Sequence, residues 1–356
     1  MPAAGARPTS AGPKPHVRRA PWHRSVWFWS AVAGVALVVS IVVSVGMGAA
    51  DIRPAEVLAS ITAHLGLAEP QLTPIRDGII WDLRLTRVLT AAAVGAGLAL
   101  CGAVMQALTR NPLADPYLLG LSSGASLGAV AVIVLGASLV LPVTAFIGAL
   151  VALAATLALA SAAGGVTPTR TVLAGVAVSA LAAALTSFVI FWSAKGDSYR
   201  EILSWLLGSL GGANWSTVAI SGVALVVIGV PLVAGGRVLD AFAFGDSAAS
   251  ALGVNVAGVR WGLLGATALL TGAMVSVSGS IGFIGLVLPH AVRLLVGSRH
   301  RALLPLAALV GAIVLVWADT IARTAFEPRE LPVGIVTAII GAPVFALILA
   351  RKRGVS

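Results

Sequence analysis

The sequence is divided into apolar runs that are long enough to cross a lipid bilayer as helices. A transmembrane helix needs about 20 consecutive apolar residues, and a bilayer accepts only helices or closed barrels because every backbone polar group needs a partner. These runs are too long and too continuous for barrel strands, and 58% of the residues are hydrophobic while 10% are charged. The pattern predicts an all-α integral membrane protein of about ten transmembrane helices, at residues 26–48, 86–108, 117–137, 139–163, 170–193, 215–235, 261–279, 281–297, 303–321 and 333–350.

The distribution of basic residues predicts the orientation of these spans. Ten spans place both termini on the same side of the membrane. With the N-terminus in the cytoplasm, 15 of the 23 Lys and Arg residues fall in cytoplasmic segments, and most of the 13 acidic residues fall outside. Cytoplasmic loops of membrane proteins are enriched in Lys and Arg, so we expect both termini to be cytoplasmic.

The chain is expected to contain one membrane domain and two short tails. Residues 1–25 are rich in Pro, Ala and Arg and lack hydrophobic periodicity, which predicts a disordered basic cytoplasmic tail. Residues 26–350 form the predicted ten-helix domain, in which residues 237–260 make a long cytoplasmic connection. Residues 351–356 form a second cytoplasmic tail.

Motifs for catalysis and metal binding are absent or out of context. Gly120 to Gly124 match the G-x-S-x-G motif of hydrolases, but a proline-bearing loop precedes Ser122 where that motif needs a strand, so we expect Ser122 to serve the first turn of a helix. No lysine follows a glycine and no histidine precedes a glutamate, which excludes a P-loop and an H-E-x-x-H zinc site. Cys101 is the single cysteine and is expected to be a packing residue. The chain itself is therefore predicted to be neither an enzyme nor a metal protein.

Charges and small residues near the spans are the remaining candidates for function. Arg84 and Arg87 are three residues apart at the outer end of the second span, so they share one helix face, and Arg323 lies at the outer end of the ninth. From the residues alone these arginines are either snorkelling anchors or a functional charge cluster. Small residues at helical spacing in the second span predict the close approach of another helix: Ala91, Gly95, Ala99 and Ala103.

Five stretches carry a specific resemblance. They are "RLTRVLTAAAVGAGLALCGAVMQALTRNPLADPYLLGLSSGAS" (84–126), "LGSLGGANW" (207–215), "ALGVNV" (251–256), "GSIGFIGLVLPHAVRLL" (279–295) and "ELPVGIVTAIIGAP" (330–343). In this order they resemble the FecCD-type permeases of bacterial ABC importers, which take up iron–siderophores, haem and vitamin B12. The likeness runs from about residue 26 to residue 350.

This resemblance implies a type II ABC importer permease bundle in the bacterial cell membrane. The expected partners are two ATP-binding subunits, an extracytoplasmic substrate-binding protein, a second permease subunit in a homodimer or related heterodimer, and membrane lipid, with no nucleic acid. No cofactor is expected on this chain, because ATP and Mg belong to the partner ATPase. In the family, the segment "RNPLADP" is the turn between the second and third helices.

The resemblance also assigns two groups of site residues. Family arginines that meet carboxylates of the binding protein fall on Arg84, Arg87 and Arg323, although Thr86 stands where the family usually has proline, which puts the start of that helix in doubt. The segment 243–256 matches the short helices that dock on the ATPase. Its coupling residues are expected to be Gly245, Asp246, Ser247, Ala248, Leu252 and Gly253.

The implied function is an alternating-access path for an iron–siderophore-type chelate. A haem or vitamin B12 permease of the same family is the alternative cargo assignment. An ion-coupled secondary transporter is the alternative from another class, and it would carry coupling acids buried in mid-span. The Asp and Glu residues fall instead at predicted span ends or in loops.

Overall fold

Every regular element in the described part of the chain is a helix. The computed structural model describes residues 22–137, 141–165, 167–193, 196, 198–242, 245–251, 253 and 255–352. These ranges contain no strand, so the predicted all-α fold is confirmed. Helices satisfy their backbone hydrogen bonds internally, which a chain of this hydropathy requires in lipid.

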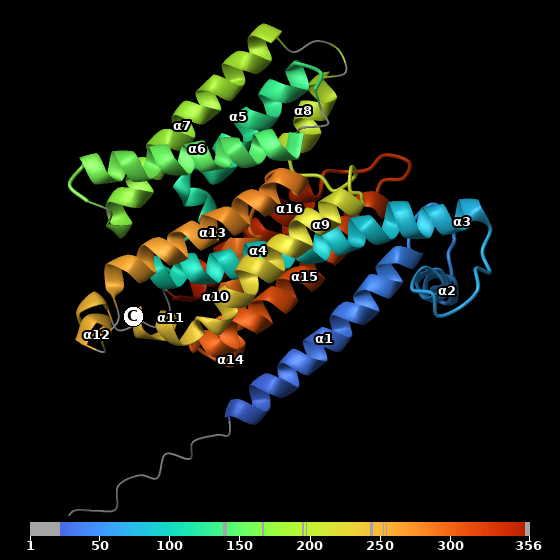
Figure 1. Ribbon diagram of the computed structural model, residues 1–356, viewed down its shortest axis with the longest axis horizontal. Coiled ribbons are helices and arrows are strands. Elements are labelled where there is room, and N and C mark those ends of the chain that lie inside the picture. The colour runs from blue at the N-terminus through green and yellow to red at the C-terminus, as the bar shows by residue number, and fades with distance from the viewer. Residues whose placement is uncertain are drawn as a thin grey trace, which may run out of the picture.

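Each of the ten predicted spans corresponds to a helical segment of the structure (Figure 1). Among the described residues, seven segments are long and apolar enough to cross a bilayer, and three apolar helices are shorter. Six of the long segments lie in or coincide with single helices or with α4 and the turns before it: α1 (Trp22–Gly46), α4 (Thr86–Thr109), α6 (Leu141–Ala162), α7 (Pro168–Ser193), α13 (Val256–Ser278) and α15 (His300–Thr324). The seventh is formed by three consecutive helices, α9 (Trp215–Ala224), η4 (Leu225–Gly229) and α10 (Val230–Ala234). The shorter apolar helices lie in α5 (Leu121–Val134), α14 (Ile284–Val296) and α16 (Val333–Lys352).

The predicted N-terminal tail extends too far along the chain. α1 begins at Trp22, so residues 22–25 are helical although we assigned them to the tail. This stretch contains no Gly or Pro to stop a helix, and polar residues are tolerated where a helix leaves the membrane. Residues 1–21 and 353–356, which hold the rest of the predicted tails, lie outside the described residues.

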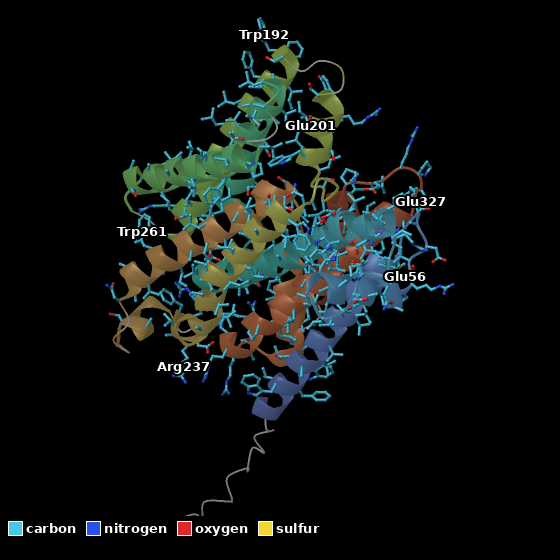
Figure 2. The ribbon with its side chains drawn as sticks, turned by 45° about the vertical axis from the view of Figure 1, so that its right-hand side comes forward. Glu56, Trp192, Glu201, Arg237, Trp261 and Glu327 are labelled. Atoms are coloured by element: carbon cyan, nitrogen blue, oxygen red, sulfur yellow. The ribbon has the colours of Figure 1, made fainter. Side chains whose placement is uncertain are left out.

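Short helices gather at the two ends of the bundle. At one end, called here the α2 end, lie α2 (Pro54–His64), α3 (Pro74–Gly78) and α8 (Ser198–Leu206), with Glu56, Glu201 and Glu327 (Figure 2). At the opposite end, called the α12 end, lie α11 (Gly236–Phe242) and α12 (Asp246–Ala251). α1 also starts at the α12 end (Figure 1). This arrangement separates the segments that we predicted to be external from the segment predicted to be a cytoplasmic connection.

The second span is part of a much longer helix. α3 continues through the π-helical turn η1 (Ile79–Leu85) into α4, so one apolar helical segment runs from Pro74 to Thr109. A helix start at residue 86 is therefore wrong. Thr86 sits inside the helix, where its Oγ1 donates to the carbonyl of Asp82 at 2.7 Å. Threonine leaves the helix unbroken because, unlike proline, it keeps its N–H and does not clash with the preceding turn.

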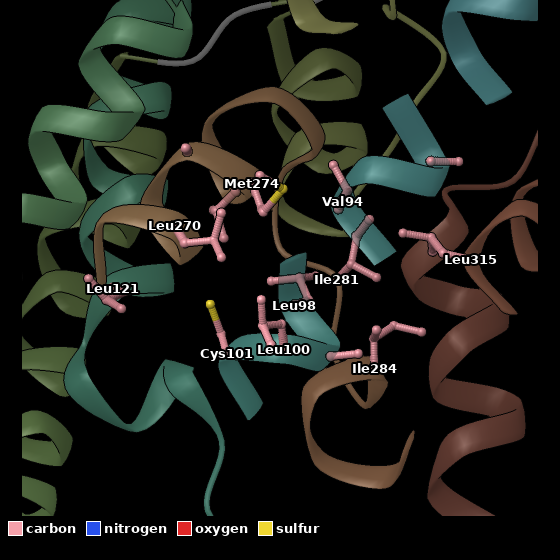
Figure 3. Packing of buried hydrophobic residues seen from close by; sticks show 14 of the residues in the cluster. Val94, Leu98, Leu100, Cys101, Leu121, Leu270, Met274, Ile281, Ile284 and Leu315 are labelled. Carbon is pink, nitrogen blue, oxygen red and sulfur yellow. The ribbon is translucent and has the colours of Figure 1, made fainter. Parts of the chain in front are cut away.

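The small residues of α4 bring it against α15, as predicted. Ala91, Ala99 and Ala103 are fully buried, and a Cβ built on Gly95 would overlap the carbonyl of Gly311 in α15. Around this contact lies the apolar core, in which Figure 3 shows Val94, Leu98 and Cys101 of α4 close to residues of α13, α14 and α15. The Cys101 thiol is buried and donates to the carbonyl of Thr267 at 3.5 Å, in agreement with a packing role.

Replacing Gly311 with alanine is expected to lower the free energy of unfolding by about 1–3 kcal/mol, the usual cost of overpacking. The new methyl group would overlap the carbonyl of Gly95 and lie 2.6 Å from the Ala99 Cβ. Gly222→Ala in α9 is the matched control, because a Cβ at Gly222 meets no atom within 4 Å. We expect this control to melt at or above the wild-type temperature, since alanine favours a helix over glycine. Equal melting of the G311A and wild-type proteins in detergent would contradict the close α4–α15 contact.

The two shortest spans follow breaks that meet inside the bundle. Before α5, the loop 110–115 and the 3-10 turn η2 (Pro116–Leu119) enter the bundle, and the Tyr117 hydroxyl donates to the carbonyl of Ile281 at 3.0 Å. Burial raises the pKa of Asp115 in this loop to about 6, although its carboxylate accepts from the Tyr117 N–H. Ser122 Oγ lies 2.6 Å from Ser280 Oγ, so this hydroxyl bridges the two breaks instead of serving its own helix turn.

Candidate functional site

One pocket at the α2 end gathers the three arginines that the sequence singled out. It has a volume of about 480 Å³, and Arg84, Arg87 and Arg323 line it together with Glu327 and Glu330. The arginines come from η1, the first turn of α4 and the last turn of α15. The fold therefore joins residues that are more than 230 positions apart in sequence.

Arg84 ends on backbone carbonyls at the C-terminus of α1. Its Nη1 donates to the carbonyls of Val45 at 2.9 Å and Gly46 at 3.0 Å, and its Nη2 donates to the carbonyl of Ala50 at 2.7 Å. A helix leaves its last four carbonyls without intrahelical partners, and its C-terminus favours a cation. Arg84 thus supplies both hydrogen bonds and charge to the end of α1.

Arg323, from the last turn of α15, binds the same end of α1. Its guanidinium donates to the carbonyls of Ser44 and Met47 and to Ser44 Oγ. The Ser44 hydroxyl is also 2.6 Å from Thr320 Oγ1, one turn before Arg323. These contacts fasten α1 to α15, and both Arg84 and Arg323 are buried by the protein.

Gly48 makes room for this pair of arginines. Its φ of +133° lies in a region that side chains rarely adopt, and a Cβ at this position would lie 2.9 Å from Arg84 Nη2 and 3.2 Å from Arg323 Nη1. Only glycine satisfies both the backbone conformation and the space.

Arg87 has carboxylate partners instead of carbonyl partners. Its Nε donates to Asp319 Oδ2 at 2.8 Å and its Nη2 donates to Asp319 Oδ1 at 3.0 Å, which is a bidentate salt bridge. Its Nη1 donates to Glu330 Oε2 at 2.6 Å. The Asp319 side chain is 2% exposed, whereas the Glu330 side chain is 54% exposed. Arg87 therefore binds one buried carboxylate and one carboxylate at the protein surface.

The charges around the pocket balance. Three arginines face three carboxylates, because Asp319 and Glu330 bind Arg87 and Glu327 lies close enough to Arg84 to attract it. Asp319 and Glu330 were not among the site residues expected from the sequence. The available signals were the i,i+4 spacing of Asp319 and Arg323 and the position of Glu330 at the start of "ELPVGIVTAIIGAP".

The predicted coupling residues lie at the other end of the bundle. Gly245 and Gly253 have φ values of +96° and +82° and flank α12, which begins at Asp246. Leu252 lies outside the described residues, as do the side-chain positions of Asp246, Ser247 and Ala248. The docking role of this segment stays a prediction.

A polar contact fastens α11 to α15 beside this segment. Asp240 Oδ1 accepts from the backbone N–H of His300 at 2.7 Å and lies 2.8 Å from His300 Nδ1. Asp240 therefore serves the first turn of α15, where orphan N–H groups favour a carboxylate. Since α15 also carries Asp319 and Arg323, one helix connects the α12 end with the arginine pocket.

Metal binding by side chains can be judged for the described residues. There, no three His, Cys, Asp or Glu side chains lie close enough together for such a site.

Comparison with known proteins identifies the family. Residues 36–351 match the FecCD transport family. The chain belongs to the FecCD transport family. It is 43% identical to the cobalamin import system permease protein BtuC of Halobacterium salinarum, over 92% of this chain and 96% of that protein. It is 45% identical to the Fe(3+)-citrate import system permease protein YfmD of Bacillus subtilis, over 77% of this chain and 81% of that protein.

A solved structure of a related transporter has the same fold. It is described as an inward-facing conformation of a metal-chelate type ABC transporter, and it superposes with a TM-score of 0.78 at 32% sequence identity. The match covers 92% of this chain and 99% of that one. The expected FecCD resemblance and the permease bundle are therefore confirmed, and this chain is a multi-pass membrane protein of an ABC importer family.

Proposed function

We propose that this chain is the permease subunit of an ATP-driven importer and forms the path for an iron–siderophore-type chelate. The observation that carries the proposal is that one bundle places a pocket of arginines at the α2 end and two short connecting helices at the α12 end. A carboxylate-bearing binding protein fits the first, and an ATPase fits the second. The likeness to metal-chelate and Fe(3+)-citrate permeases supports this cargo class.

The orientation follows from the basic residues. We place the α12 end and both termini in the cytoplasm and the α2 end outside, because the positive-inside rule requires it. On this orientation α12 faces the cytoplasmic ATPase, and Arg84, Arg87 and Arg323 face the extracytoplasmic binding protein. ATP and Mg then bind the partner ATPases, and this chain holds no cofactor.

The mechanism is conformational. Closure of the two ATPase subunits on ATP pushes α12, and the Asp240–His300 contact passes that movement from α11 to α15. Movement of α15 relative to a second permease subunit opens or closes the path between them. Large apolar side chains exposed on α7, including Phe191 at 85% and Trp192 at 75%, supply surface for that subunit or for lipid.

Two alternatives remain to be separated from this proposal. A haem or vitamin B12 permease differs only in cargo, and the cobalamin permease of Halobacterium salinarum supports it. An ion-coupled secondary transporter needs an exchangeable buried acid. Asp319 is buried in α15, but Arg87 holds both of its oxygens, so it does not fit that role.

The test is uptake by cells that produce this permease together with its ATPase and binding protein. We expect ferric citrate, haemin or cobalamin to accumulate only with an active ATPase, and to stop accumulating when the P-loop lysine of the ATPase is replaced. The purified permease alone should hydrolyse no ATP, because it has no P-loop. Uptake that persists with the inactive ATPase and collapses with the ion gradient would identify a secondary transporter instead.

A further inference from the structure

The guanidinium of Arg87 binds a different carboxylate at each of two places: Asp319 at Nε and Nη2, and Glu330 at Nη1. Asp319 occupies the side edge, formed by Nε and Nη2, with two hydrogen bonds. The end edge, formed by Nη1 and Nη2, is the remaining edge that can bind a carboxylate through two parallel bonds. Glu330 holds Nη1 of this edge at 2.6 Å. A carboxylate from outside that binds this edge therefore competes with Glu330 for Nη1.

Glu330 is placed to leave without disturbing the fold. The residues on either side of it are fixed by backbone bonds, from the Arg329 N–H to the Phe326 carbonyl and from the Leu331 N–H to the Ala322 carbonyl, both at 2.9 Å. The side chain itself is 54% exposed and reaches Arg87 across the mouth of the pocket. A rotation about side-chain bonds is enough to move this carboxylate into water.

The charge balance of the pocket gives this movement a consequence. With Glu330 in place, three arginines are matched by Asp319, Glu327 and Glu330, and the pocket offers little attraction to an acidic surface. With Glu330 turned away, one positive charge is uncovered, and its end edge is free.

We infer that Glu330 is an internal substitute for a partner carboxylate, which an acidic protein surface displaces when it binds Arg87. This inference rests on the proposed docking role of the pocket and adds that Arg87 is the exchangeable docking residue. Arg84 and Arg323 keep their carbonyl partners on α1 throughout. The partner group that fits best is a carboxylate able to bind two nitrogens in one plane. Competition with Glu330 keeps its binding weak enough to be reversible in each transport cycle.

The test uses a fluorescently labelled hexaglutamate peptide and the full-length permease in lipid nanodiscs. Removing the competitor with Glu330→Gln is expected to tighten peptide binding about three- to tenfold and to steepen its dependence on salt, since the free charge is then larger. Glu69→Gln is the matched control, because exposed Glu69 lies between α2 and α3, does not line the pocket, and loses the same charge.

Two further variants tie the effect to Arg87. Arg87→Lys keeps a positive charge for Asp319 but has no planar edge, so it should weaken peptide binding and abolish the gain from E330Q in the double variant. E330Q binding no tighter than wild type, with R87K still weakened, would reject the role of Glu330 and leave the docking role intact. Equal gains from E330Q and E69Q, or a gain that persists in R87K/E330Q, would overturn the inference as a general charge effect. Equal binding by R87K and wild type would reject Arg87 as a docking residue altogether.

Discussion

The Asp319→Ala permease is expected to lose about 3–5 kcal/mol of folding free energy, the usual cost of removing one partner from a buried ion pair. Asp319 is 1% exposed, accepts two hydrogen bonds from Arg87, and lies 3.9 Å from Arg323 Nε. Without it, two guanidinium groups keep their burial and lose their common counterion. Thermal unfolding of the purified protein in detergent, followed by light scattering and tryptophan fluorescence, measures the loss.

Glu330→Ala is the control for this prediction because it removes a carboxylate from the same arginine. Glu330 is largely exposed, so its removal should cost about 0–1 kcal/mol. If D319A and E330A unfold at the same temperature, the buried carboxylate does not stabilise the junction of α4 and α15. If both variants unfold well below the wild-type temperature, the exposed Glu330 carboxylate stabilises the fold as the buried Asp319 carboxylate does, which contradicts the prediction.

The ten spans could be predicted because the length of an apolar run is a local property of the sequence. The same local reasoning failed at the α2 end, where the predicted span starts at residue 86 and the helix starts at Pro74. Polar residues interrupt the apolar run there, and distant parts of the fold satisfy them. Asp77 accepts from the Ser60 hydroxyl at 2.6 Å, and Asp82 accepts from Trp215 Nε1 at 3.2 Å.

The arginines of the site could be predicted, but their partners could not. Arg84, Arg87 and Arg323 are visible as charges at the ends of apolar runs and as matches to a family pattern. Arg84 and Arg323 bind backbone carbonyls of α1, and a carbonyl is common to every residue, so no sequence signal marks it. Glu330 is 243 residues from Arg87, and only the folded bundle brings the two together.

These partners divide the three arginines by role. Arg84 and Arg323 donate to backbone carbonyls at the end of α1 and in the residues just after it, including Met47 and Ala50. Arg87 instead binds one buried and one exposed carboxylate. A variant that lacks all three arginines would lose helix contacts and docking contacts together. Separate substitution of Arg87 and of the Arg84–Arg323 pair is therefore needed to tell stability from binding.

The Arg84→Ala/Arg323→Ala double variant is expected to lose about 3 kcal/mol or more of folding free energy, because a hydrogen bond from a charged group contributes about 1.5–3 kcal/mol. The carbonyls of Ser44, Val45 and Gly46 would lose their donors, and amide hydrogen exchange in residues 43–50 should become faster than in wild type. Arg329→Ala, which removes an exposed arginine from the same end of the bundle, should change neither stability nor exchange. Unchanged exchange in the double variant would mean that α15 and α4 hold α1 without the two guanidinium groups. Slower docking with unchanged exchange would instead return Arg84 and Arg323 to the docking surface beside Arg87.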